Sequence, residues 1–221
     1  MHGASTSHDV SRSGLHVLNQ GNGRMCLFEQ DGDYAVFERV LAEGCRRVPM
    51  RIVAYCLMPN HWHLLLWPAT DGTVSRFIGW VTLTHTKRWH SYRQSVGTGH
   101  MYQGRFKSFV VQQDAHLLTV CRYVERNAVR AKLVERAEQW RWSTAGQQSV
   151  SDRVVPLSTG PVEWLRWVNE TESAEQVVAT RKSVVKGQPC GTDAWVAQMV
   201  MDWGLQATLR SPGRSRRDDR K

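Results

Sequence analysis

The spacing of apolar positions changes several times along the chain, and each change marks an expected element. Alternation with a period of two is typical of a strand, and recurrence at three and four residues is typical of a helix. After the capping residue Asp31, for example, apolar residues recur at helical spacing through Leu41. The pattern predicts strands at 15–19, 50–58, 61–67 and 102–111, and helices from 31 to about 44–47, at 74–92 and at 115–126.

The order of these elements indicates the fold class. A strand, a helix and two consecutive strands form the first half of a ferredoxin-like sheet, and a further helix and strand complete it. We therefore expect an α+β protein in which a ferredoxin-like antiparallel sheet is flanked by helices. At 221 residues the chain can bury one core and carry a small extension.

A helical C-terminal extension is expected after this unit. The composition turns polar near 147–152, which favours a boundary. A helix is expected at 162–168, a loop at 182–191, and a short helix between the capping residue Thr192 and Gly204. The predicted division is a disordered lead-in at 1–13, a main domain at 14–147, a helical extension at 148–209 and a basic tail at 210–221.

Two histidines lie two residues apart in the third predicted strand. Side chains alternate between the faces of a strand, so His61 and His63 point the same way and Trp62 points the other way. Two neighbouring neutral imidazoles can chelate a divalent metal ion. The alternative is an amphipathic strand whose polar positions are histidines. On either interpretation, Trp62 is expected to anchor the strand in the core.

Composition narrows the classes of partner. The formal net charge of +9 and the pI near 9.7 favour a polyanion, nucleic acid first, and tryptophan beside Lys or Arg suits stacking on unpaired bases. Five scattered cysteines with no C-x-x-C pair argue against a disulfide framework and for a reducing cytoplasm. The polar N-terminus and the absence of an apolar run of about 20 residues argue against secretion and membrane insertion.

Positive side chains gather at two places in the main domain. Lys87 and Arg88 lie on the predicted helix at 74–92, where a solvated face is the ordinary interpretation and a phosphate track is the functional one. Arg105 and Lys107 flank Phe106 in the strand predicted at 102–111. On a strand they would share a face, which fits contact with a DNA backbone.

A tyrosine could supply the missing chemistry. Tyr123 and Asn127 fall one turn apart at the edge of the core-facing side of the last predicted helix. Packing is the ordinary role of such a tyrosine. Its hydroxyl could instead attack a phosphodiester beside a Mg²⁺ or Mn²⁺ ion that His61, His63 and the Asn127 oxygen bind.

These residues also carry a family resemblance. The stretch from Tyr55 to Leu66 resembles the HUH motif (His, hydrophobe, His) of the single-strand DNA transposases that use one tyrosine. Within that group the chain resembles the REP-associated tyrosine transposases from about residue 14 to the C-terminus. The matching stretches are 16–24, 97–108, 122–131, 140–143 and 191–210.

The resemblance implies a function and a set of residues. It implies an HUH fold with a catalytic domain at 14–147, a DNA-binding extension at 148–209, and metal-dependent cleavage and rejoining of DNA in the bacterial cytoplasm. Tyr123 would form a 5′-phosphotyrosine, and the metal would bind His61 and His63. The partner would be a REP palindrome, a hairpin of single-stranded DNA, bound by a monomer or homodimer. The expected DNA-binding residues are Arg105, Lys107, Arg130, Lys87, Arg88, Trp195 and Arg210.

Three positions depart from the family pattern, and other functions stay open. Tyr102 replaces a usual Trp and ranks second as nucleophile, Ala128 replaces a usual Pro, and Asn127 replaces the Gln of related transposases. The first alternative is a regulator that binds REP hairpins without chemistry. The second is a metal-dependent hydrolase of small phosphoesters, which the basic surface and the tyrosine–amide pair disfavour.

Overall fold

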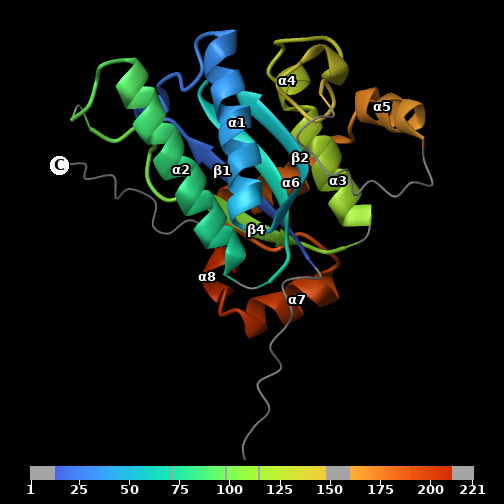
Figure 1. Cartoon of the computed structure of the whole chain (residues 1–221). Helices are drawn as coiled ribbons and strands as arrows, with labels where there is room; N and C mark the ends of the chain where they lie inside the picture. The colour runs from blue at the N-terminus through green and yellow to red at the C-terminus, as the bar shows by residue number, and fades with distance from the viewer. Residues whose placement is uncertain (1–12, 71, 98, 114, 148–159, 211–221) are drawn as a thin grey trace, which may run out of the picture.

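Four strands pair into one antiparallel sheet with the order β2-β3-β1-β4. The computed structural model describes residues 13–70, 72–97, 99–113, 115–147 and 160–210 (Figure 1). Most of the predicted lead-in (1–13), boundary (147–152) and tail (210–221) lies outside the described residues, which include only 13, 147 and 210 of these ranges. The strands are β1 at Gly14–Gln20, β2 at Met50–Met58, β3 at His61–Pro68 and β4 at Lys107–Val111. This is the strand order of a ferredoxin-like sheet, so the predicted fold class is confirmed.

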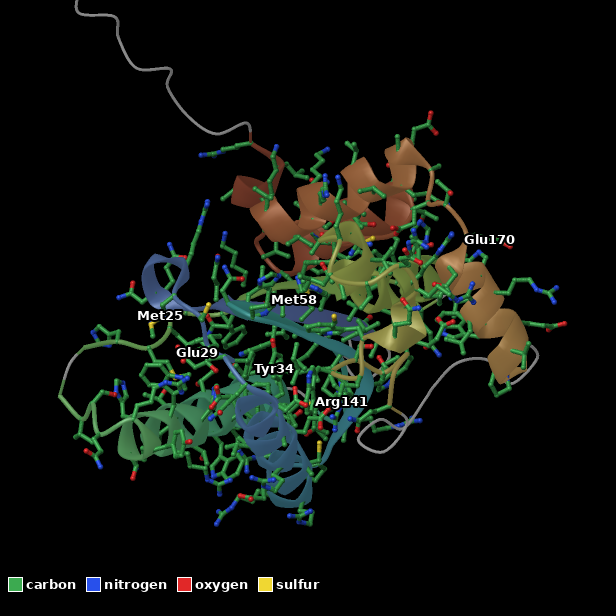
Figure 2. The ribbon with its side chains drawn as sticks, turned by 90° about the horizontal axis from the view of Figure 1, so that it is seen from above. Met25, Glu29, Tyr34, Met58, Arg141 and Glu170 are labelled. Atoms are coloured by element: carbon green, nitrogen blue, oxygen red, sulfur yellow. The ribbon has the colours of Figure 1, made fainter. Side chains whose placement is uncertain are left out.

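Helices cover both faces of the sheet. One face is covered by α1 at Asp31–Arg47 and α2 at Thr73–Tyr92. The other carries α3 at Ala115–Glu125 and the C-terminal helices, so the molecule has three layers (Figure 2). The other described helices are η2 at Asn22–Arg24, α4 at Asn127–Arg130, η3 at Ala137–Gln139, α5 at Pro161–Asn169, α6 at Ala174–Lys186, α7 at Asp193–Asp202 and α8 at Gln206–Leu209.

Strand β3 faces two separate cores. Trp62, Leu64 and Leu66 pack under α1 and α2, whereas Leu65 and Trp67 pack under α3. Trp62 has no exposed surface, which confirms its predicted role as the core anchor of the strand. Because side chains alternate, the histidines of β3 must lie on the α3 side.

A glycine brings the two helices of the first face close together. A Cβ atom at Gly44 of α1 would lie 2.9 Å from Cε2 of Phe77 and 3.1 Å from Cγ2 of Val81, both on α2. Any larger residue would push the helices apart. The start of α1 differs slightly from the prediction, since Gln30 rather than Asp31 is the capping residue and exchanges bonds with Asp33.

Both edges of the sheet are covered by later parts of the chain. On the β2 edge, Leu57 N donates to Trp142 O at 2.9 Å and Thr144 N donates to Tyr55 O at 3.0 Å. On the β4 edge, Cys190 N donates to Val110 O at 2.9 Å. The edge strands therefore expose fewer unpaired backbone groups, which disfavours pairing with another chain.

Two predicted elements are wrong in part. Strand β4 begins at Lys107, so Arg105 lies outside it, because the chain bends at Gly104, whose φ is +138°. The loop predicted at 182–191 is helical up to Lys186, since Ser173 caps α6 and Gly187 ends it at a φ of +69°. In the described part of the chain, no helix is both long and apolar enough to cross a bilayer.

Candidate active site

The two histidines of β3 lie side by side on the α3 face of the sheet. The ring centroids of His61 and His63 are 5.1 Å apart, with an angle of 78° between the rings. His63 is buried between β1 and β2, where Leu18 and Cys56 are its cross-strand neighbours, and His61 is half-buried at the start of the strand. The predicted pairing of these side chains on one face is therefore present.

Each histidine ring has one nitrogen engaged in a hydrogen bond. Nδ1 of His61 lies 2.7 Å from Oδ1 of Asn60, and since that oxygen only accepts, the ring donates. Nδ1 of His63 lies 2.9 Å from Nε2 of His16 on β1. With His63 as the donor, Nε2 of both β3 histidines keeps its lone pair. This arrangement of ring orientation and tautomer fits metal-binding histidines.

Burial keeps these histidines neutral at physiological pH. It lowers the pKa of His61 to about 4 and that of His16 to about 3. The pKa of His63 is held well below its usual value, by burial first and then by the charges of His16, His61 and Arg130. Neutral imidazole is the ligand form, so protons do not compete for these nitrogens at pH 7.

No third ligand of the usual kind completes this pair. Among the described residues, no three His, Cys, Asp or Glu side chains are grouped so that they could hold a metal ion. Cys56 faces His63 across the strands, and burial raises the pKa of its thiol to about 12. Within the described part of the chain, an amide oxygen is another type of group that could act as a third ligand.

Helix α3 places Tyr123 against the histidine pair within the same chain. The ring of Tyr123 packs edge-on against that of His63, with centroids 6.1 Å apart and an angle of 80°. Leu117, Val120 and Val124 fill the core beneath the helix, as predicted. The tyrosine is only 6% exposed.

Asn127 lies one turn after Tyr123, at the start of α4. Its amide nitrogen donates to the backbone oxygens of Tyr123 and Val124, both at 3.2 Å. The amide oxygen is therefore the atom of this side chain that could act as a ligand. Asn127 is 9% exposed and lies in the turn directly after Tyr123. The two side chains are therefore neighbours, as their spacing in the sequence predicted.

Arg130 covers the tyrosine. Its Cζ lies 3.9 Å from the centre of the Tyr123 ring, its Nη2 donates to the Tyr123 carbonyl, and its Nη1 lies 2.8 Å from Oε2 of Glu172. The guanidinium is thus engaged within the protein, and the predicted contact of Arg130 with DNA stays a prediction. Its position nonetheless puts a positive charge beside the candidate nucleophile.

The segment from α5 to Glu172 clamps the helix that carries Tyr123. Trp164 Nε1 donates to Oε2 of Glu125 at 2.8 Å, and Arg122 donates to the carbonyl of Glu170 at 2.6 Å. Arg126 donates to the Val168 carbonyl at 2.6 Å and to Glu172 at 3.1 Å. Glu170, labelled in Figure 2, lies at the end of α5 on the α3 side of the sheet. We name these contacts the α3 clamp.

Two predicted DNA-binding residues lie close to the histidines. Lys107 is the cross-strand neighbour of Leu18, which itself pairs with His63. Lys107 and Arg105 line a depression of about 230 Å³ together with residues 18–20 of β1 and Gln103. Arg105 therefore reaches the same place as Lys107 from a bend rather than from a shared strand face.

The other predicted DNA-binding residues are not brought to this site. Lys87 and Arg88 lie on α2, across the sheet from the histidines, and Arg88 forms an ion pair with Glu43 at 2.7 Å. Trp195 lies on α7, and Arg210 directly follows α8. Their roles in DNA binding stay predictions.

The second candidate nucleophile faces the other core. The hydroxyl of Tyr102 accepts from Trp62 Nε1 at 3.1 Å and lies 2.6 Å from Nδ1 of His85. Because Trp62 points away from His61 and His63, Tyr102 lies on the α1/α2 side of the sheet. Burial also raises the pKa of its hydroxyl. These contacts favour a structural role.

Sequence reasoning missed three residues of the site: His16, Asn60 and Glu172. Alternation along β1 places His16 on the histidine face, but only the strand register shows that it meets His63. Asn60 could have been found from the sequence, because it directly precedes His61 and its side-chain oxygen can bond the histidine ring. Glu172 carried no signal, since its partner Arg126 is 46 residues away.

Comparison with known proteins gives consistent results. A model of the family described as "Transposase IS200 like" matches residues 9–127. A protein of Haemophilus influenzae named as a REP-associated tyrosine transposase is 25% identical over 116 residues, which span 49% of this chain and 66% of that protein. The match therefore covers slightly less than two thirds of the relative.

Solved structures resemble the fold. The structure of a REP-associated tyrosine transposase bound to a REP hairpin aligns with a TM-score of 0.50 and 18% identity, covering 61% of this chain and 76% of that one. A transposase structure from Deinococcus radiodurans aligns with a TM-score of 0.40 and 15% identity, over 60% of this chain and 92% of that one.

Proposed function

This chain belongs to the IS200-like transposase family, and from that premise we propose that it cleaves and rejoins single-stranded DNA at REP-type hairpins. The observation that carries the proposal is the contact between Tyr123 and His63 within one chain, with Nε2 of both β3 histidines available. The proposed partner is also supported by the relatives named for REP elements.

The proposed reaction is a transesterification. The hydroxyl oxygen of Tyr123 attacks phosphorus, the bond from phosphorus to the 3′ oxygen breaks, and the hydroxyl proton of the tyrosine is replaced by the 5′ phosphate. The departing 3′ oxygen takes up a proton. In the reverse direction, a 3′ hydroxyl attacks the phosphotyrosine and releases Tyr123. One phosphoester replaces another, so rejoining needs no ATP.

We propose that a divalent metal ion binds beside the histidine pair. Nε2 of His61, Nε2 of His63 and the amide oxygen of Asn127 would hold it, and Mg²⁺ or Mn²⁺ suits a mixed nitrogen and oxygen site with open positions. When bound, the ion would withdraw charge from the phosphate. Arg130 adds a positive charge on the tyrosine side.

The positions of Lys107 and Arg105 suggest how the strand is held. Both line the depression beside β1, next to the cross-strand neighbours of the histidines. Phosphates on one side of the cleaved bond would contact these cations, which position the backbone without reading its sequence. The whole reacting set comes from one chain, which supports catalysis in cis.

One observation favours a second candidate function. Tyr123 is 6% exposed beneath Arg130, so a chain in which this cover never opens would bind hairpins without cutting them. Such a regulator would bind DNA with a steep salt dependence and would not respond to EDTA.

The test is a covalent adduct. The protein is incubated with Mn²⁺ and an oligonucleotide that carries a REP-type hairpin with single-stranded flanks, and products are separated under denaturing conditions. The proposal predicts a protein–DNA band that Tyr123→Phe and EDTA abolish and that Tyr102→Phe keeps. A band that persists in Tyr123→Phe and disappears in Tyr102→Phe would reassign the nucleophile. Tight binding with no band under any condition would favour the regulator.

A further inference from the structure

A second depression, of about 630 Å³, adjoins the proposed cleavage site. It is lined by Asn19 of β1, Asn22 of η2, one side of α2 and the segment 99–106. We name it the loop pocket. It shares Asn19, Gln103 and Arg105 with the smaller depression beside the histidines, so the two depressions adjoin at these residues, although the α2 wall lies on the other side of the sheet. Its volume lies within the range of about 300–1,000 Å³ that is typical of ligand pockets.

The walls of the loop pocket combine two kinds of surface. Leu83 of α2 is 55% exposed there, and Phe106, which also lines the pocket, is half-buried. Amide groups come from Asn22 and Gln103. Apolar and aromatic side chains offer a face on which a flat ring can stack, while amides can both donate to and accept from its edge.

The floor of the pocket is held rigidly. Tyr102 is fixed by its bonds to Trp62 and His85. The backbone beside it is tied to β1 and η2, because Asn22 N donates to Met101 O at 2.8 Å and Gln103 N donates to Gln20 O at 2.9 Å. A site that is already ordered loses less entropy when a ligand binds. These contacts also give the buried Tyr102 hydroxyl a role outside the chemistry.

We infer that the loop pocket binds one unpaired nucleobase of the DNA strand that runs from the proposed cleavage site. The inference rests on the proposed function and adds a base-binding subsite to it. Arg105 lines both depressions and Lys107 lines the one beside the histidines, where they suit the phosphates of a connecting strand. The base stacks on Leu83 and Phe106, and the amides of Asn22 and Gln103 read its edge.

The chemistry of the walls favours this occupant over two others. A phosphate alone would gain nothing from Leu83 and Phe106. An apolar peptide would leave the amides and Arg105 with fewer hydrogen-bond partners as it displaced water. A nucleotide satisfies the apolar, amide and cationic parts together, which is how single-strand binding sites are commonly built.

The first test compares the affinities of two oligonucleotides, one with bases and one without, for a variant that cannot cleave DNA. The Tyr123→Phe protein, kept in EDTA, is titrated with a fluorescent dT12 oligonucleotide and with a fully abasic 12-mer of equal charge. We expect dT12 to bind about tenfold more tightly. Phe106→Leu and Leu83→Ala should reduce this ratio at least by half, whereas Leu133→Ala, at a leucine of similar exposure outside the pocket, should keep it.

A crosslink then locates the base. A dT12 that carries one 4-thiothymidine is irradiated with the same protein, and the attached peptide is identified by mass spectrometry. Attachment within 99–106 or at Leu83 supports the inference. Equal binding of the two oligonucleotides, an unchanged ratio in both pocket variants, or attachment only at Trp89 and Tyr92 in the separate depression between α1 and α2 overturns it. Neither readout needs cleavage, so failure here is distinct from failure of the adduct test.

Discussion

The candidate active site has two halves that are held in place in different ways. The sheet half (also called the histidine or metal half) is the pair His61 and His63 on β3, and the tyrosine half is Tyr123 on α3 with Asn127 on α4. His61 and His63 are part of a central strand whose opposite face is anchored by fully buried apolar residues such as Trp62 and Leu64. Tyr123 lies on a helix that is tied from outside by the α3 clamp, whose contacts are mostly charged or polar. His61 and His63 should therefore tolerate changes in the extension, while Tyr123 and Asn127, which would move with the clamped helix, should not.

The two halves also differ in whether the contacts that hold them lie inside the part of the chain that matches the family model, residues 9–127. The family match ends at residue 127, yet the clamp partners Trp164, Glu170 and Glu172 come later. The histidine half is thus complete within the matched region. The tyrosine half is also held by residues after 127. The C-terminal extension therefore packs against the helix that carries Tyr123, besides any contact that it makes with DNA.

The largest expected effect is the fall in Mn²⁺ affinity when one of the two β3 histidines is removed. His63→Ala should weaken Mn²⁺ binding by more than about 100-fold, because a direct ligand outweighs the 10–100-fold cost of losing an outer-shell partner. Titration followed by electron paramagnetic resonance measures this. His90→Ala serves as the control, since His90 lies on α2 and bonds Ser95. Equal affinity in both variants would remove the histidine pair from the metal site.

A change in the clamp should affect the tyrosine half alone. Glu172→Ala leaves Arg126 and Arg130 without their shared carboxylate in a largely buried place, which should cost about 3 kcal/mol of unfolding free energy. Adduct formation should fall by a larger factor than Mn²⁺ affinity, because His61 and His63 stay in place while Asn127 follows the released helix. Denaturant unfolding and metal titration measure the two effects. A parallel loss of metal affinity would show that the halves are not independent.

Acid should weaken the fold through the sheet half. His61 has a folded pKa of about 4 against about 6.5 when unfolded, so between these values the unfolded chain binds more protons. Stability is therefore full above pH 6.5 and falls as the pH drops toward 4. At pH 5 this group alone should cost about 1–2 kcal/mol, measurable by urea unfolding at pH 7 and pH 5. A His61→Asn variant should show a smaller difference, and an unchanged one would contradict the assignment.

The smallest expected effect concerns the link between the core and the loop pocket. Tyr102→Phe keeps the apolar ring but removes the hydroxyl that accepts the hydrogen bond from Trp62 Nε1, at a cost of about 1 kcal/mol. Thermal unfolding should detect the loss. Mn²⁺ affinity should not change, because Trp62 points away from the metal half. A drop in affinity would mean that the register of β3 depends on this bond.

Sequence patterns predicted most of the sheet half and less of the tyrosine half. Alternation placed His61 and His63 on one face, and helical spacing brought Tyr123 and Asn127 together. Arg105 was misplaced because a bend at Gly104 interrupts the apparent strand. The clamp could not be predicted, because its ion pairs join residues more than 40 apart and depend on the packing of α5 against α3. Local periodicity carries no information on such contacts.

The central claim is that Tyr123, next to the histidine pair, is the attacking group. The most direct measurement is mass spectrometry of the digested protein–DNA adduct formed with Mn²⁺ and a REP-type hairpin oligonucleotide. We predict a single modified residue, Tyr123, that carries the 5′ phosphate of the cleaved strand. A modification on Tyr102 or on any other residue would contradict it.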